Sequence, residues 1–210
     1  MFWDSVAGVY DVFVNIINRK THKALKEIVA AEIEAGDSVL ECGCGTGMLS
    51  LVIAGKCKEL TATDFSLKML MKAAKKCGVC GNVYFSFADI TELNYPDNYF
   101  DKVVAGNVIH LLDQPIKALE ELNRVCKPGG VLIIPTYVNK NHKEGKNVLK
   151  VAVAKAGVDF KRSFTTENYK RFFLDAGYED VEIVMAEGRI SCAVATMTKI
   201  GETVWERKKT

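Results

Sequence analysis

Hydrophobic residues in this chain alternate between two periods, one typical of buried strands and one typical of amphipathic helices. Short apolar runs predict strands at 38–42, 59–63, 82–87, 100–105 and 130–136. Apolar positions three and four residues apart predict helices between them, at about 47–55, 66–77 and 114–126. Helical connections of this kind join neighbouring parallel strands. The alternation therefore predicts an α/β fold built on a mostly parallel sheet.

Beyond the fifth predicted strand the pattern changes. A helix is expected to begin at Thr165 or Thr166, either of which can cap it, and to end at Gly177. Two strand-like runs follow at 178–185 and 190–199, with a glycine-containing turn between them. This arrangement predicts a hairpin that closes the parallel sheet with an antiparallel pair.

The chain is predicted to form a single domain. Its 210 residues suffice for one sizeable core, and 49% hydrophobic with 26% charged residues is ordinary for a globular protein. Two helical stretches, at about 3–18 and 21–35, precede the first strand. The expected parts are a helical cap at 1–36, a ligand-binding core at 37–136, a lid or specificity insert at 137–164, and a closing helix with hairpin at 165–210.

Composition also limits the compartment and the partners. No apolar run approaches the roughly 18 residues that cross a bilayer, so stable membrane insertion is not expected. The first residues show no basic segment followed by an apolar stretch, which favours a cytoplasmic location. A net charge of +2 gives no reason to expect a nucleic-acid partner.

The cysteines favour reduced thiols rather than disulfides or a metal site. There are seven, an odd number in a chain without an evident export signal. Cys77 and Cys80 have the spacing of metal ligands, but no second pair completes a set of four. No bound metal is therefore expected, and core packing is the preferred explanation for the thiols.

A glycine-rich loop follows the first predicted strand. It reads Glu41-Cys42-Gly43-Cys44-Gly45-Thr46-Gly47, with an apolar helix after it. Because glycine lacks a Cβ, the backbone can turn sharply and a ligand can approach the main chain closely. A dinucleotide-binding G-x-G-x-x-G loop would need glycine where this chain has Met48. The loop thus predicts a nucleotide-like ligand and disfavours a dinucleotide pyrophosphate.

Acidic residues end the second and third predicted strands. Asp64 lies 23 residues after Glu41, where a carboxylate can accept hydrogen bonds from both hydroxyls of a ribose. The alternative is that Asp64 only caps the next helix. Phe65 beside it is placed to cover an adenine ring, or else is a core aromatic. Asp89 ends the third strand, either as a second ligand-binding acid or as a turn aspartate.

Taken together, these segments resemble the class I S-adenosylmethionine (SAM)-dependent methyltransferases, in particular the small-molecule branch known as methyltransferase type 11. The glycine loop resembles motif I of that family, and Arg124–Gly130 resembles its entry into strand five. Residues 2–11 look like the opening of the quinone-biosynthesis methyltransferases. The resemblance implies SAM as cofactor. It also implies a Rossmann-like, seven-stranded, mostly parallel sheet with an antiparallel last strand, helices on both faces and an N-terminal helical cap.

The resemblance also implies which residues bind SAM. The glycine loop would pack against the methionine portion, with Glu41 near its amino end. Asp89 would meet the adenine amino group, and the Ala105 carbonyl would face the ammonium group. The complete predicted set is Glu41, Gly43, Cys44, Gly45, Asp64, Phe65, Asp89, Ile90, Ala105, Gly106 and Asn107.

Catalytic residues are less constrained by the sequence. Methyl transfer depends mainly on alignment, which supplies about 7–11 kcal/mol at best. If the acceptor must lose a proton, His110 is the best local base, although a histidine there could equally be a packed helix residue. Tyr10 could position the acceptor from the cap, or belong to an apolar stripe. Tyr137, Asn139 and His142 are candidates for the acceptor pocket.

The predicted function is methyl transfer from SAM to a small-molecule acceptor by in-line displacement, in a monomer or homodimer. The lysine-rich segment 137–164 either covers an anionic or membrane-embedded acceptor or is a solvated basic face. One alternative is a noncatalytic SAM-binding regulatory or partner-activating protein. An RNA or protein methyltransferase lacks support, because no Asn-Pro-Pro-Tyr-type tetrad follows strand four. A nicotinamide oxidoreductase is opposed by Met48.

Overall fold

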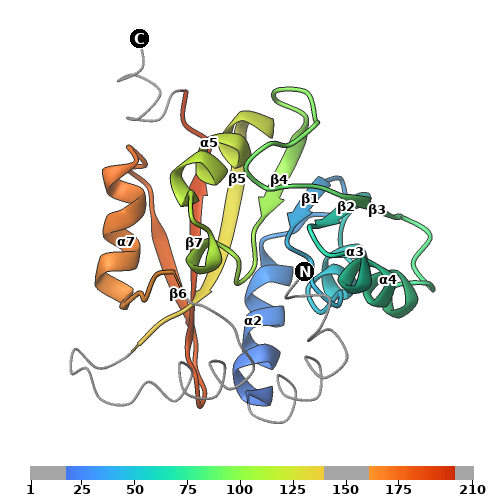
Figure 1. Cartoon of the computed structure of the whole chain (residues 1–210), viewed down its shortest axis with the longest axis horizontal. Coiled ribbons are helices and arrows are strands. Elements are labelled where there is room, and N and C mark those ends of the chain that lie inside the picture. The colour runs from blue at the N-terminus through green and yellow to red at the C-terminus, as the bar shows by residue number, and fades with distance from the viewer. Residues whose placement is uncertain (1–17, 140–160, 202–210) are drawn as a thin grey trace.

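The computed structural model describes residues 18–139 and 161–201 (Figure 1). Nearly all of the helix predicted at 3–18 lies outside the described residues. So do most of the segment 137–164, including His142, and the end of the chain from residue 202.

The strands of the described residues form one seven-stranded sheet in the order β3-β2-β1-β4-β5-β7-β6. Strands β1 to β5 are parallel, whereas β7 runs antiparallel to both β5 and β6. This confirms the predicted seven-stranded fold with its antiparallel last strand. The strands are β1 (Ser38–Cys42), β2 (Glu59–Asp64), β3 (Val83–Phe87), β4 (Phe100–Val104), β5 (Cys126–Tyr137), β6 (Glu182–Ala186) and β7 (Cys192–Thr198).

Helices cover both faces of this sheet. They are α2 (Arg19–Ala31), α3 (Ser50–Ala54), α4 (Leu67–Lys76), α5 (Pro115–Val125) and α7 (Thr166–Asp175), with a 3₁₀ turn η1 at Ile109–Leu111. One apolar core joins α5 and α7 to the sheet through residues such as Leu122 and Phe173. A second joins α2, α3 and α4 through residues such as Leu25 and Ile53. Burying each such side chain contributes about 1.5–3 kcal/mol. Among the described helices, none combines the length and apolarity required to span a bilayer.

Two helices are shorter than the pattern of apolar residues predicts. Helix α3 begins at Ser50 rather than at 47, because Gly47 has a φ of 80°, a left-handed conformation that no α-helix contains. Helix α2 ends at Ala31 rather than at 35. The Glu34 amide donates to the Asp37 side chain at 2.7 Å, so it is not available for a helical bond.

The C-terminal elements differ in detail from their predicted bounds. Helix α7 is capped by Thr165 as expected, since the Thr165 hydroxyl accepts from the Asn168 amide at 3.2 Å. Strand β6 begins at Glu182 rather than at 178, because Tyr178 turns into the core and donates its hydroxyl to Asn123 Oδ1 at 3.1 Å. The hairpin itself is present, with β6 and β7 paired antiparallel.

Strand β5 begins before the predicted residue 130. Its pairing with β4 shifts between Phe100↔Cys126 and Lys102↔Val131, so extra residues of β5 bulge out of the ladder. The segment Arg124–Gly130, which resembles the family's entry into strand five, thus contains a bulge at the start of β5. A side chain at Gly130 has no room there, since a Cβ would lie 2.7 Å from the Asp101 carbonyl oxygen.

The strand order reverses between β1 and β4, since β2 and β3 lie on one side of β1 while β5 lies beyond β4. In open α/β sheets, ligands bind outside the carboxyl ends of the strands at such a switch point. A ligand site is therefore expected among the loops that follow β1, β2, β3 and β4.

Candidate functional site

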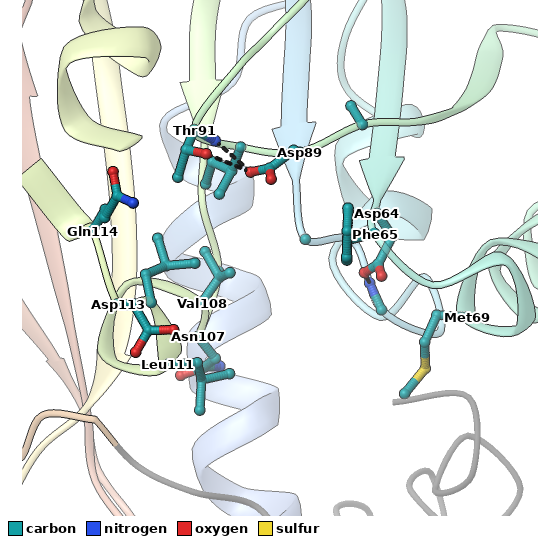
Figure 2. A pocket seen from close by; sticks show the side chains of 16 residues that line it. Asp64, Phe65, Met69, Asp89, Thr91, Asn107, Val108, Leu111, Asp113 and Gln114 are labelled. Carbon is teal, nitrogen blue, oxygen red and sulfur yellow. Dashed lines mark hydrogen bonds between the residues drawn. The ribbon is translucent and has the colours of Figure 1, made fainter. Parts of the chain in front are cut away.

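A pocket of about 410 Å³ opens at the carboxyl ends of these strands. This volume lies within the roughly 300–1,000 Å³ of small-molecule sites. Figure 2 shows its walls, with Asp64, Phe65 and Met69 on one side and Val108, Leu111 and Asp113 on the other. The pocket therefore spans the topological switch point.

The glycine loop after β1 forms part of the pocket wall through Gly43 and Gly45. Both residues have positive φ, 69° and 56°, which L-residues with a Cβ rarely adopt. A Cβ added at Gly45 would meet no atom within 4 Å, whereas one at Gly43 would lie 3.2 Å from Val108. A ligand can therefore approach the main chain of Gly45 closely.

Asp64 stands at the end of β2 and lines the pocket. Its Oδ2 accepts from the Gly45 amide and its Oδ1 from the Ser66 amide, both at 2.8 Å. The cap of α4 is Ser66, whose hydroxyl accepts from the Met69 amide, so Asp64 does not cap that helix through its side chain. A carboxylate oxygen has more than one acceptor site, which lets it bind ligand hydroxyls in addition to amides.

Phe65 presents an aromatic face to the pocket. Its side chain is 48% exposed, so the alternative of a core aromatic is wrong. Its ring centroid lies 5.1 Å from that of Phe87, which is also exposed. These two rings form an apolar surface next to Asp64, suited to a flat ligand.

Asp89 and Ile90 follow β3 on the same pocket wall. Asp89 Oδ1 accepts from both the amide and the hydroxyl of Thr91 at 2.8 Å, so the residue does serve as a turn aspartate (Figure 2). It also lines the pocket, where its carboxylate can meet a ligand amino group. The turn and the binding role are thus compatible.

The segment after β4 supplies the opposite wall through Gly106 and Asn107. Asn107 has a φ of 56°, and its amide donates to the Pro135 carbonyl of β5 at 2.8 Å. Ala105 and Cys44 are buried and are not among the described residues that line the pocket. Their predicted contacts with SAM stay predictions.

Glu41 is buried behind the glycine loop and is likewise absent from the described pocket wall. Its Oε2 accepts from the Ser50 hydroxyl at 2.5 Å. Burial raises its pKa to about 8, the Ser50 bond opposes this rise, and the charge of nearby Asp64 adds to it. The predicted contact with the amino end of SAM stays a prediction.

The raised pKa of Glu41 should make the folding stability depend on pH. Because the folded protein holds this proton up to about pH 8, folding stability falls as pH rises from about 4.5 to 8, by about 1.4 kcal/mol per pH unit at most. We expect Glu41→Gln to remove this dependence, so that the variant gains stability relative to the parent as pH rises. Thermal unfolding of both proteins at pH 5, 6, 7 and 8 measures the difference, and a constant difference would contradict the assignment.

His110 lies in η1, is 3% exposed and is not among the described pocket-lining residues. Its Nδ1 is 2.8 Å from Thr136 Oγ1. Burial lowers its pKa to about 4, so the ring is neutral and weakly basic at neutral pH. Its role as a base stays a prediction, and Tyr10 lies outside the described residues.

The sequence did not single out several residues that line the pocket. They follow the same strand ends as the predicted ones, one or a few positions further along the chain. The main ones are Met69, Thr91, Val108, Leu111, Leu112, Asp113 and Gln114. No group of three or more metal-ligating side chains occurs in the described part of the chain.

The pocket fits an adenosyl ligand. Asp64 can accept from ribose hydroxyls, Phe65 and Ile90 can contact adenine, and the open main chain at Gly45 admits a close neighbour. The fold is that of class I SAM-dependent methyltransferases, and residues 40–134 match the model of a methyltransferase domain family. The matched region, residues 40–134, is thus a methyltransferase domain of the class I SAM-dependent kind, whose cofactor is SAM.

Two curated relatives are methyltransferases named for quinones. The Bdellovibrio bacteriovorus ubiquinone/menaquinone biosynthesis C-methyltransferase is 34% identical over 144 residues, which cover 66% of this chain and 61% of that protein. The demethylmenaquinone methyltransferase of Staphylococcus aureus is 27% identical over 212 residues, covering 90% and 88%. Residues 40–134 and these alignments thus confirm the resemblance to quinone-biosynthesis methyltransferases.

Solved structures agree on the fold. A SAM-dependent methyltransferase from Thermotoga maritima superposes with a TM-score of 0.72 at 20% identity, covering 95% of this chain and all of that one. A SAM-dependent methyltransferase from Aquifex aeolicus gives a TM-score of 0.62 at 25% identity, covering 85% and 89%.

Proposed function

We propose that the protein transfers the methyl group of SAM to a small-molecule acceptor by in-line displacement. The observation that carries this proposal is the meeting of Asp64, Asp89 and the open main chain of Gly45 in one pocket at the switch point. Bound SAM would supply an electrophilic methyl group on a sulfonium. The protein would supply binding and alignment.

Each wall of the pocket has a distinct task in this proposal. Asp64 binds the ribose, while Phe65 and Ile90 cover the adenine. Gly106 and Asn107 form the end at which the acceptor meets the methyl group. Alignment of acceptor and methyl at that end can contribute about 7–11 kcal/mol.

The rest of the wall keeps water from the reacting centre. Val108, Leu111 and Leu112 contribute apolar side chains to the pocket wall that follows Asn107 in the chain. A dry site favours displacement at a sulfonium, because the positive charge is dispersed in the transition state and hydration would stabilise the reactant more.

We infer that the acceptor is a hydroxylated aromatic ring of the quinol class. The support is the relationship to proteins named for demethylmenaquinone and ubiquinone/menaquinone methylation. The predominantly apolar wall formed by Val108, Leu111 and Leu112 suits such a ring.

Calorimetric titration with SAM and, separately, with NADH tests the cofactor. We expect saturable binding of SAM and none of NADH. Formation of S-adenosylhomocysteine is then measured with quinols, phenols and small amines as acceptors, and turnover with a quinol is the expected result. SAM binding without turnover on any acceptor would instead favour a noncatalytic SAM-binding regulatory or partner-activating protein.

A further inference from the structure

Asn107 adopts an uncommon backbone conformation where the chain leaves β4. Its φ is 56°, one of two positive values among the described residues other than glycine. The Asn107 amide donates to the Pro135 carbonyl of β5 at 2.8 Å, which holds this conformation. Residues held in this region occur preferentially at functional sites, and Asn107 lines the pocket on the wall opposite Asp64 (Figure 2). The direction of its side chain is therefore of interest.

The side chain of Asn107 points away from the part of the pocket proposed to hold the adenosyl group. Its Oδ1 lies 3.7 Å from the thiol of Cys192, the first residue of β7. Strand β7 lies beyond β5 on one side of β4, whereas Asp64 and Asp89 follow strands on the other side. Asn107 thus reaches toward the acceptor end, although the family resemblance places it among the SAM-binding residues.

The contact with Cys192 leaves the nitrogen of the Asn107 side chain unused. Burial raises the pKa of the Cys192 thiol, so the sulfur keeps its proton and can donate to Asn107 Oδ1 or to the Ala193 carbonyl, 3.9 Å away. Asn107 Nδ2 forms no hydrogen bond with any residue that the structure describes. Among those same residues, the only buried side-chain nitrogen or oxygen without a partner is His22 Nδ1. Asn107 Nδ2 is therefore an accessible donor.

The pocket wall beside Asn107 is apolar. Val108 and Leu111 follow it in the chain and line the same pocket. In small-molecule sites, a few polar groups in an apolar wall fix the orientation of the ligand. The NH₂ group of an amide is uncharged and can only donate, so it suits an oxygen that accepts a hydrogen bond and need not be ionised.

We propose that Asn107 recognises the acceptor by donating a hydrogen bond from Nδ2 to one of its oxygens, a carbonyl or a hydroxyl. This inference rests on the proposed function and refines its acceptor site. The ring of the acceptor would lie against Val108 and Leu111, while the hydrogen bond would fix which atom faces the methyl group. Asn107 is then a determinant of specificity, because a ring without oxygen gains nothing from this donor.

Two bicyclic probes that differ only in a carbonyl test this role. They are 1-tetralone and tetralin, the same ring system without the oxygen. Calorimetric titration of each into protein saturated with S-adenosylhomocysteine gives the ratio of the two affinities, in which packing of the ring largely cancels. We expect the ratio of 1-tetralone to tetralin affinity to fall about tenfold in Asn107→Gly, a loss typical of one hydrogen bond. Glycine keeps the left-handed backbone and removes the donor.

Asn107→Asp is the second variant. Aspartate also tolerates the left-handed conformation, retains an oxygen for Cys192, and replaces the NH₂ group by an oxygen that cannot donate when ionised. The ratio should fall by at least about tenfold here too, because the carbonyl of 1-tetralone would face a second acceptor. An unchanged ratio in both variants, or no binding of 1-tetralone by the parent, overturns the inference.

Asn98 provides the matched control. It is the other described residue besides glycine with a positive φ, 58°, and it lies outside the described pocket wall. Its Oδ1 accepts from Lys199 Nζ, so Asn98→Gly also removes a side-chain contact at a left-handed position. This variant should keep the affinity ratio of the parent. An equal fall in Asn98→Gly and Asn107→Gly would attribute the effect to the backbone and overturn the inference.

Affinity for S-adenosylhomocysteine distinguishes a contact with the acceptor from one with the cofactor. It should be the same in the parent and in Asn107→Gly. A loss of about tenfold or more would assign Nδ2 to the carboxylate of the cofactor and overturn the inference. If the probes bind as expected but no acceptor is methylated, the proposed function fails while the recognition of an oxygen by Asn107 stands.

Discussion

Asp64→Ala is expected to weaken SAM binding about 100-fold, or about 2.7 kcal/mol. The carboxylate would accept from two ribose hydroxyls, and hydrogen bonds to a charged group contribute about 1.5–3 kcal/mol each. Asp64→Asn retains one acceptor oxygen and should lose less, about tenfold. Calorimetric titration with SAM measures both losses.

Asp64 also holds the glycine loop, so its removal must be separated from a general loss of structure. Its two oxygens accept from the Gly45 and Ser66 amides. Asp180 is a matched control, because its carboxylate accepts from the Thr198 amide at 3.1 and 3.3 Å, outside the pocket wall. Asp180→Ala should lower thermal stability while leaving SAM affinity intact. Unchanged SAM affinity in a folded Asp64→Ala protein would refute the ribose assignment.

The fold could be predicted from the sequence because hydrophobic residues recur with clear periods along its helices and strands. Each predicted strand from 38–42 to 130–136 corresponds to an observed one, since buried parallel strands leave short apolar runs between turn residues. Errors occur where a single residue overrides the period. Helix α3 begins later than predicted because Gly47 has a left-handed backbone conformation. Helix α2 ends earlier because the Glu34 amide donates to the Asp37 side chain.

The candidate site was predictable for a different reason. Asp64, Asp89 and Gly106 are far apart in the sequence, but each follows a parallel strand, and the carboxyl ends of such strands meet at one edge. Once the strands are predicted, these three residues can therefore be predicted to lie close together.

Side-chain direction was not predictable in the same way. Glu41 points from β1 to Ser50 of α3 and lies behind the glycine loop, although its neighbours Gly43 and Gly45 line the pocket. His22 reaches Tyr137 only because α2 packs against β6 and β7, the latter paired with β5. No short-range signal in the sequence reports such a contact.

A substitution in the glycine loop is expected to affect both SAM binding and the strain of the backbone, and the two effects can be measured separately. Gly45→Val should reduce SAM affinity by at least about 100-fold, which is about 2.7 kcal/mol. The φ of Gly45 is 56°, and a Cβ there meets no protein atom within 4 Å, so the added side chain occupies the open space of the pocket instead. A β-branched residue is also a genuine outlier at this φ. The folded protein should therefore be destabilised as well.

Gly129 provides the control that distinguishes the two effects. Its φ is 76°, and a Cβ there also meets nothing within 4 Å, but the residue lies in the β5 bulge and not in the pocket wall. Gly129→Val should thus lose stability by a comparable amount, with at least about 1–2 kcal/mol from the left-handed backbone alone, and retain SAM affinity. Thermal unfolding and SAM titration of both variants separate the outcomes. If both lose affinity equally, strain transmitted through the fold explains the loss, and Gly45 does not contact the cofactor.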